Sequence, residues 1–61
     1  MTDPIDAERE RLTEIIRAAG GQILRSDFLK GELRAEIEYR ADSQHYFRVT
    51  IQELAVASIG A

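Results

Sequence analysis

The fold is decided by one stretch of sequence, GELRAEIEYRADSQHYFRVTIQE, which covers residues 31–53. From Leu33 to Ala41 every odd-numbered residue is apolar and every even-numbered residue is charged, and the alternation resumes at Phe47. A period of two residues is typical of a strand that buries one face and exposes the other. The pattern therefore predicts two strands whose odd-numbered side chains form the core, joined by the polar residues 42–44.

The length of the loop between these strands predicts how they pair. Directly opposed residues lie on the same face of a sheet, so odd positions must oppose odd positions, which requires an odd number of loop residues. With Asp42-Ser43-Gln44 as the loop, the inner pairs are Ala41–His45, Tyr39–Phe47, Ile37–Val49 and Ala35–Ile51. The outer pairs are Arg40–Tyr46 and Glu38–Arg48, and the opposite charges of the second pair favour this register.

Residues 22–29, QILRSDFL, predict a third strand that precedes this pair. A two-residue loop at Lys30-Gly31 would join it to the next strand, because glycine tolerates the positive φ of such turns. The resulting inner pairs are Phe28–Leu33, Ser26–Ala35 and Leu24–Ile37. Two opposite-charge pairs then fall on the outer face, Asp27–Arg34 and Arg25–Glu36. Exposed pairs of this kind support the register more than they stabilise the fold.

A short helix is the alternative for residues 22–33. Ser26 could cap such a helix, in which Gly31 would cost about 1 kcal/mol relative to alanine. The chain would then read helix, short helix and β-ribbon, which is the outline of a truncated winged helix. The charge pairs favour the three-stranded arrangement, but the sequence leaves both open.

An amphipathic helix is predicted near the start of the sequence. Asp3 is a good N-cap residue, and Pro4 suits the first helical position because its missing N–H is not needed there. An apolar stripe follows at helical spacing, made of Leu12, Ile15, Ile16 and Ala19. The first two turns are expected to be mostly solvated. Gly20-Gly21 ends the helix, since glycine readily adopts the left-handed conformation that follows a C-cap.

Residues 52–59 form an apolar tail with two possible structures. Thr50 and Glu53 match a capping box, which predicts a helix. Ala55, Ala57 and Ile59 alternate along the chain, which predicts a strand instead. In either form the tail is suited to docking on the sheet or on another subunit.

Together these patterns predict one small α+β domain over residues 1–61. An N-terminal amphipathic helix packs on a three-stranded antiparallel meander, and the short apolar tail follows. The expected core combines the helix stripe with the inner face of the sheet: Leu12, Ile15, Ile16, Leu24, Phe28, Leu33, Ile37, Tyr39, Phe47, Val49 and Ile51.

The chain has 61 residues and no cysteine, which limits how it can be stabilised. A domain of this size buries only about 60% of the surface of its unfolded chain. Neither disulfides nor a thiolate metal site can compensate, so association is the expected remedy, and we expect a homodimer. No stretch matches the apolar core of a signal peptide or a membrane span, which favours a cytoplasmic protein.

Few residues suggest catalytic chemistry. Because the sequence has one histidine, any acid–base scheme must use His45, which is expected at the rim of the sheet beside Asp42 and Ser43. A histidine in that position is more often structural than catalytic. Gly20-Gly21 follows a helix rather than a strand and so does not match a phosphate-binding loop. We expect no enzyme activity, no cofactor and no metal site.

The outer face of the predicted sheet is the best candidate for function, because arginine, glutamate and tyrosine alternate on it. Arginine and tyrosine are enriched in binding hot spots, and mixed charges favour a partner with complementary charges. The expected partner-binding residues are Arg34, Arg40, Tyr46 and Arg48. Either edge of the sheet could also pair with a strand from another chain.

The sequence therefore predicts a small non-enzymatic protein-binding module with a regulatory role, of the size common among bacterial and phage accessory proteins. The alternative is a nucleic-acid-binding protein of winged-helix or double-stranded-RNA-binding type, since the latter fold has the order helix, three strands, helix. The net charge of −3 opposes this alternative, because binding to phosphates normally needs a basic surface. Glu36 and Glu38, which interleave with the outer arginines, oppose it as well.

Overall fold

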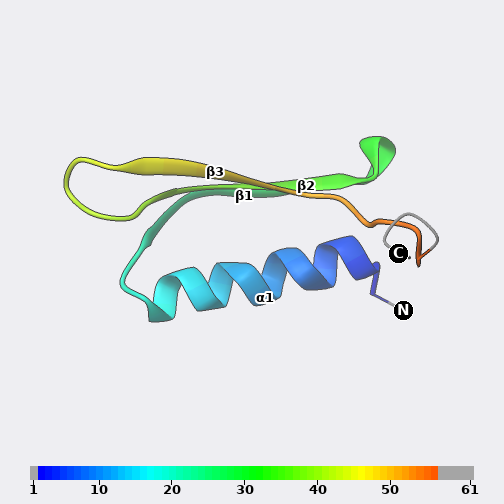
Figure 1. Ribbon diagram of the computed structural model, residues 1–61, viewed down its shortest axis with the longest axis horizontal. Coiled ribbons are helices and arrows are strands. Elements are labelled where there is room, and N and C mark those ends of the chain that lie inside the picture. The colour runs from blue at the N-terminus through cyan, green and yellow to red at the C-terminus, as the bar shows by residue number, and fades with distance from the viewer. Residues whose placement is uncertain (1, 57–61) are drawn as a thin grey trace.

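One helix lies against one face of a three-stranded sheet in the computed structural model, which describes residues 2–56 (Figure 1). The elements are α1 (Pro4–Ala18), β1 (Gln22–Leu29), the 3₁₀ turn η1 (Lys30–Glu32), β2 (Arg34–Arg40) and β3 (Tyr46–Ile51). All strand pairs are antiparallel and the strand order is β1-β2-β3. The predicted α+β fold and its meander are confirmed.

The ends of α1 follow the predicted signals. The Asp3 carboxylate accepts a hydrogen bond from the Ile5 N–H at 2.9 Å, and Pro4 occupies the first turn. At the other end, Gly20 has φ +96°, a conformation that glycine adopts without strain. The buried residues of α1 are Ile5 in its first turn and Thr13 in its third.

The register between β2 and β3 is the one that the loop length predicts. Opposed pairs run from Arg40–Tyr46 beside the loop to Ala35–Ile51 at the far end. Beyond β2 and β3, the Ala41 N–H donates to the His45 C=O at 2.9 Å, which closes the three-residue loop. The odd-numbered side chains of both strands therefore share the face that α1 covers.

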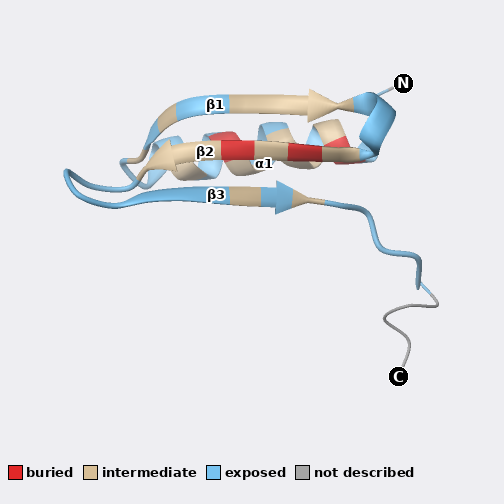
Figure 2. Ribbon diagram, turned by 90° about the horizontal axis from the view of Figure 1, so that it is seen from above, coloured by how far each residue is buried: buried red, intermediate tan, exposed pale blue. Residues whose placement is uncertain are grey.

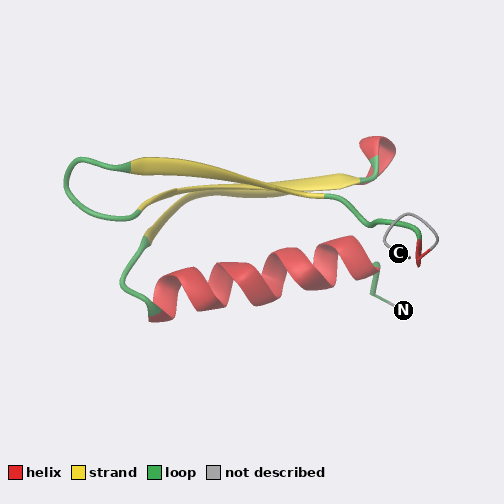
Figure 3. Ribbon diagram, in the orientation of Figure 1, coloured by secondary structure: helices red, strands yellow, loops and turns green. Residues whose placement is uncertain are grey.

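The predicted register between β1 and β2 is wrong by two residues. Phe28 opposes Ala35 rather than Leu33, and Ser26 opposes Ile37. The reason is the connection, which uses the 3₁₀ turn η1 followed by Leu33 with φ 51° instead of a two-residue turn. The short helix considered for residues 22–33 is also wrong, since β1 continues to Leu29 and helical structure is confined to η1 (Figure 3).

A bulge in β1 changes which face Leu24 occupies. Ile23 opposes Tyr39 and Arg25 opposes Glu38, so Leu24 is the extra residue between two paired positions. The expected Leu24–Ile37 pair does not form, and the Leu24 side chain is 51% exposed instead of buried. Because of the bulge, Ile23 and Ser26 both reach the inner face although their numbers differ in parity.

The core is smaller than predicted. Within the described residues the buried apolar side chains are Ile5, Ala35 and Ile37, on α1 and the central strand (Figure 2). Six predicted core residues are half-buried: Leu12, Ile16, Phe28, Tyr39, Val49 and Ile51. Four others are exposed, which corrects the prediction: Ile15, Leu24, Leu33 and Phe47. The single helix lies mainly over β1 and β2, so β3 and its inner face are left partly open.

Replacing Leu33 with glycine should stabilise the chain by about 1 kcal/mol, because a left-handed backbone strains any residue with a Cβ. The Leu33 side chain is 67% exposed, so its removal costs little packing. Urea unfolding followed by circular dichroism measures the effect. Leu29→Gly, a matched change in the strand before η1, should destabilise the chain. A loss of stability for Leu33→Gly would contradict the expectation.

The predicted tail is only partly described. Gln52–Ala55 is neither helix nor strand, and residues 57–59 of the predicted segment lie outside the described residues. Leu54 and Val56 are exposed. Among residues 2–56, no helix is long and apolar enough to cross a membrane.

Candidate protein-binding surface

The sheet face opposite α1, called here the outer face, carries the even-numbered side chains of β2 and β3. No element within the described residues covers it (Figure 1). The strand pairing fixes which of its side chains are neighbours, since directly opposed residues lie about 5 Å apart. This face therefore presents a defined pattern of side chains to its surroundings.

Arg40 and Tyr46 oppose each other on this face, next to the loop. The Arg40 Nε donates to the Asp42 C=O at 3.1 Å, which holds the guanidinium near the loop. No carboxylate of the described residues lies within ion-pair distance of Arg40, although its charge helps to lower the pKa of Asp42, and Tyr46 is 60% exposed. The prediction that these two residues would stand together without an internal ion-pair partner agrees with the geometry.

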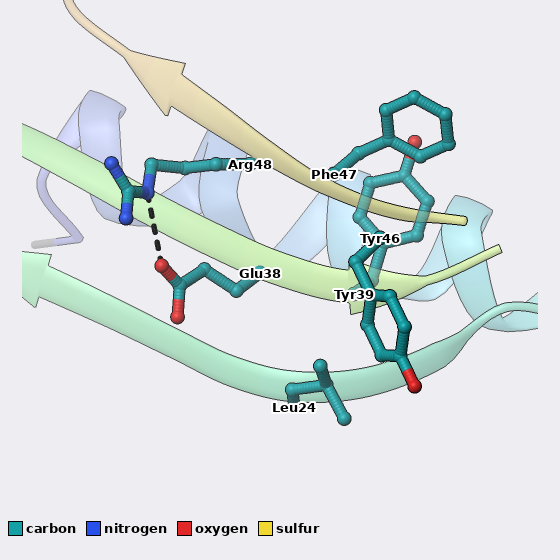
Figure 4. A pocket seen from close by; sticks show the side chains of 6 residues that line it. All are labelled: Leu24, Glu38, Tyr39, Tyr46, Phe47 and Arg48. Atoms are coloured by element: carbon teal, nitrogen blue, oxygen red, sulfur yellow. Dashed lines mark hydrogen bonds and ion pairs between the residues drawn. The ribbon is translucent and has the colours of Figure 1, made fainter. Parts of the chain in front are cut away.

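Arg48 is next to this pair but is already engaged. Its Nε lies 2.9 Å from a carboxylate oxygen of Glu38, as the sequence predicts. Leu24 reaches the same area through the bulge. Figure 4 shows the resulting hollow and its lining residues: Leu24, Glu38, Tyr39, Tyr46, Phe47 and Arg48. We call Leu24, Arg40, Tyr46 and Arg48 the hairpin cluster.

Arg34 does not belong to the hairpin cluster. It begins β2 while Arg40 ends it, which separates the two by about 20 Å along the strand. The Arg34 guanidinium lies 3.4 Å from Glu32, and the predicted Asp27–Arg34 pair is not formed. Its Nε is buried without a hydrogen-bond partner among the described residues. The four predicted site residues are thus three neighbours and one distant residue.

The β1 side of the outer face is occupied by internal ion pairs. Arg25 lies 2.9 Å from Glu36, although it opposes Glu38 and not Glu36 as predicted, and it lies 3.3 Å from both Asp27 and Glu38. Pairs as exposed as these contribute little stability. They neutralise the acidic side chains that would otherwise surround the hairpin cluster.

Leu24 is the member of this surface that the sequence prediction missed. A partial signal was present, because Ile23 and Leu24 are adjacent apolar residues, although Phe28 and Leu29 are a second such pair in the same strand. Two neighbouring apolar residues in a strand indicate that one of them leaves the alternation, as a bulge permits. The strand pattern alone does not say which of the two turns outward.

His45 lies in the loop and contacts Asp42. Its Nδ1 is 2.7 Å from one Asp42 carboxylate oxygen, and the same oxygen accepts the Gln44 N–H at 2.9 Å. Both side chains are exposed, and no nucleophile or third polar group is held against the imidazole among the described residues. The arrangement ties the loop together, in agreement with the structural role expected of His45.

The pKa of Asp42 should lie below its ordinary value of 3.8, because its carboxylate accepts the Gln44 N–H and contacts the His45 ring. Because the pKa is lower in the folded state than in the unfolded chain, the contacts of the ionised Asp42 carboxylate stabilise the fold at pH values above the unfolded pKa. This stabilisation is lost as the pH falls through the folded-state pKa. Carbon NMR titration of the Asp42 carboxyl measures it. His45→Ala should raise the midpoint only partway, since the Gln44 N–H is the larger cause. A wild-type midpoint at or above 3.8 would contradict this.

A second polar cluster joins α1 to β1 inside the fold. The Arg9 guanidinium donates to the Ser26 hydroxyl at 2.7 Å and lies 2.8 Å from Asp6. The Thr13 hydroxyl donates to the Arg9 C=O at 2.7 Å and lies 3.0 Å from the Ser26 hydroxyl. These contacts satisfy polar groups between the helix and the sheet, so the cluster is a structural contact.

No group of three or more metal-binding side chains occurs within residues 2–56. No protein-family model, no curated protein and no solved structure matches this chain.

Proposed function

We propose that the chain is a small non-enzymatic protein-binding module that acts in the cytoplasm as a homodimer and regulates a protein partner by contact with its sheet. One observation carries the proposal: the hairpin cluster combines Arg40, Tyr46 and Leu24 on a face that no described element covers. The remaining regions of the outer face are occupied by internal ion pairs.

The composition of the hairpin cluster supports this function. Arginine and tyrosine are, with tryptophan, the residues enriched in hot spots, so Arg40 and Tyr46 carry this argument and Leu24 only adds apolar area beside them. Arg40 is held by the loop through the Asp42 C=O, so little side-chain freedom is lost when a partner binds. A carboxylate on the partner could bind Arg40 without displacing an internal ion pair, while Tyr46 and Leu24 supply apolar area.

The proposal is tested by affinity capture with matched variants. Arg40→Glu combined with Tyr46→Ala should reduce the affinity for the captured protein roughly tenfold or more, as expected for hot-spot residues. Arg17→Glu on α1 is the control, because it makes the same charge change at an exposed arginine away from the sheet. Circular dichroism confirms that all variants fold. A partner that binds the double variant as well as the wild type would contradict the proposal.

The alternative is that the chain binds nucleic acid through the same arginines. The described elements follow the order helix and three strands, which the double-stranded-RNA-binding fold shares, whereas the winged-helix outline is excluded by β1. Binding to mixed DNA and RNA at about 50 mM salt tests it, since phosphate contacts are strongest at low salt. Tight binding that Arg40→Glu removes would favour the alternative over a protein partner.

A further inference from the structure

Within residues 2–56, β3 forms a free edge of the sheet. Its residues pair with β2 on one side, and no described strand lies on the other. The Ala41–His45 hydrogen bond shows which N–H and C=O groups of β3 point toward β2 and which point away from it. This follows because hydrogen-bonded and non-hydrogen-bonded pairs alternate along an antiparallel ladder. Phe47, Val49 and Ile51 direct their N–H and C=O groups to β2. Tyr46, Arg48 and Thr50 therefore direct theirs outward.

The two edges of the sheet differ in how they are protected. β1 contains a bulge, which interrupts the regular ladder that an incoming strand needs. β3 has no proline, lysine or bulge. The inner face beside it is also apolar and poorly covered, since Phe47 is 51% and Ile15 49% exposed. The β3 edge is thus the one that favours a new strand.

We propose that β3 pairs antiparallel with β3 of a second copy, in the register that places Val49 opposite Val49 of that copy. A two-fold axis perpendicular to the sheet then relates the copies, so both α1 helices lie on the same face of one continuous sheet. This inference rests on the homodimer in the proposed function and specifies the surface that forms it.

The register follows from parity and charge. Residues that oppose each other must lie on the same face, so even positions oppose even ones across the axis. The two centres that pair most of β3 are Arg48 and Val49. A centre at Arg48 places two guanidinium groups opposite each other, which is unfavourable. The Val49 centre instead opposes Arg48 with Thr50 of the second copy.

The same register matches the apolar side chains of the inner face. Phe47 of each copy lies opposite Ile51 of the other, and the two Val49 side chains meet at the axis. Phe47 is the most exposed of the predicted core residues on β3, so pairing covers apolar surface where α1 does not reach. A single strand pair buries less than the roughly 800 Å² per partner of a standard interface, so we expect a dissociation constant of about 10–100 µM.

Cysteine cross-linking tests the register, because the chain has no cysteine of its own. In the proposed dimer Val49 faces its copy in a non-hydrogen-bonded pair, where Cα atoms are about 4.5 Å apart and a disulfide can form. Val49→Cys should therefore oxidise to a covalent dimer at least about tenfold faster than Thr50→Cys, whose copies lie diagonally about 7–8 Å apart. Thr50→Cys keeps Arg48, so the charge that sets the register is unchanged. Gln22→Cys, on the β1 edge, gives the rate of chance collisions. Equal rates for all three variants, or the fastest reaction for Thr50→Cys, would overturn the proposal.

A charge change at Thr50 separates dimer formation from folding. Thr50 opposes Glu36 within the chain, and in the dimer it opposes Arg48 of the second copy. Thr50→Glu should therefore lower the stability of the monomer but tighten the dimer, while Thr50→Lys should do the reverse. Sedimentation equilibrium and dilute-solution unfolding measure the two effects, each expected to be a few-fold in equilibrium constant.

These outcomes are independent of the partner-binding surface. If neither Thr50 variant changes association in its expected direction, edge pairing is wrong. Loss of capture by Arg40→Glu with Tyr46→Ala would still support the outer face as a partner site in that case. If the dimer forms as described but no protein depends on the hairpin cluster, the proposed partner site is wrong and the edge pairing stands.

Discussion

Ile37→Ala is expected to remove a large part of the free energy of unfolding of the chain. Ile37 is fully buried at the centre of β2, between Ser26 of β1 and Val49 of β3 and under α1. Truncation of a buried isoleucine to alanine costs about 2–5 kcal/mol. At roughly 0.05–0.15 kcal/mol per residue, a chain of this length has about 3–9 kcal/mol in total. The loss is therefore a large part of the whole.

Urea unfolding monitored by circular dichroism measures this effect. Leu54→Ala is the matched control, because it removes a similar side chain from a position that is 65% exposed. It should change the free energy of unfolding by less than about 0.5 kcal/mol. A loss below about 1 kcal/mol for Ile37→Ala would mean that Ile37 is not the centre of the core.

Gly21→Ala is the second substitution with a large expected effect. A Cβ at Gly21 would lie 2.7 Å from the Ile16 Cγ2 and 3.1 Å from the Ile16 carbonyl oxygen. That carbonyl also accepts the Gly21 N–H at 2.9 Å, so the backbone cannot move away without losing the bond that closes the helix. Forcing a methyl group into such a site costs about 1–3 kcal/mol.

Gly31→Ala provides the comparison for Gly21→Ala. A Cβ at Gly31 meets no atom within 4 Å, and Gly31 does not have a positive φ. This variant should keep its stability or gain slightly, since alanine reduces the freedom of the unfolded chain. If both alanine variants unfold at the same urea concentration, the close approach of the Gly20-Gly21 turn to Ile16 does not govern stability.

The β2–β3 hairpin could be predicted in detail because its pattern and its loop constrain each other. Three polar residues separate two alternating segments, and only one pairing keeps every odd-numbered side chain on the same face. The Glu38–Arg48 contact at 2.9 Å then follows from the register. The register of this hairpin could therefore be predicted from its own sequence.

The β1–β2 connection could not be predicted in the same way. A two-residue turn and a 3₁₀ turn with Leu33 in the left-handed region differ by two residues of register but keep the same parity. Alternation therefore does not distinguish them. Leucine is also a poor residue for a left-handed position, so no local preference indicated this turn.

The members of the hairpin cluster were predicted only in part, because the register of one strand pair was predictable and that of the other was not. Arg40 and Tyr46 became neighbours once the hairpin register was known, whereas Arg34 was included only because it shares their face. Parity assigns residues to a face but not to a position along it. Leu24 was wrongly assigned to the core because a regular strand was assumed. The bulge at Leu24 reverses which residues of β1 face inward on its N-terminal side. The sequence pattern also does not show how much of the sheet one helix can cover. Phe47 and Ile15 were therefore predicted to be buried, but both are about half exposed.

Amide hydrogen exchange at two protein concentrations tests most directly whether this chain functions by association through β3. In the monomer the outward N–H groups of Tyr46, Arg48 and Thr50 exchange quickly, while those of Phe47 and Val49 are protected by β2. Raising the concentration from about 5 to 500 µM should slow exchange at the three outward amides if the proposed dimer forms over this range. The outward amides of the β1 edge serve as the reference and should not change. Identical exchange at Tyr46, Arg48 and Thr50 at both concentrations would contradict the account.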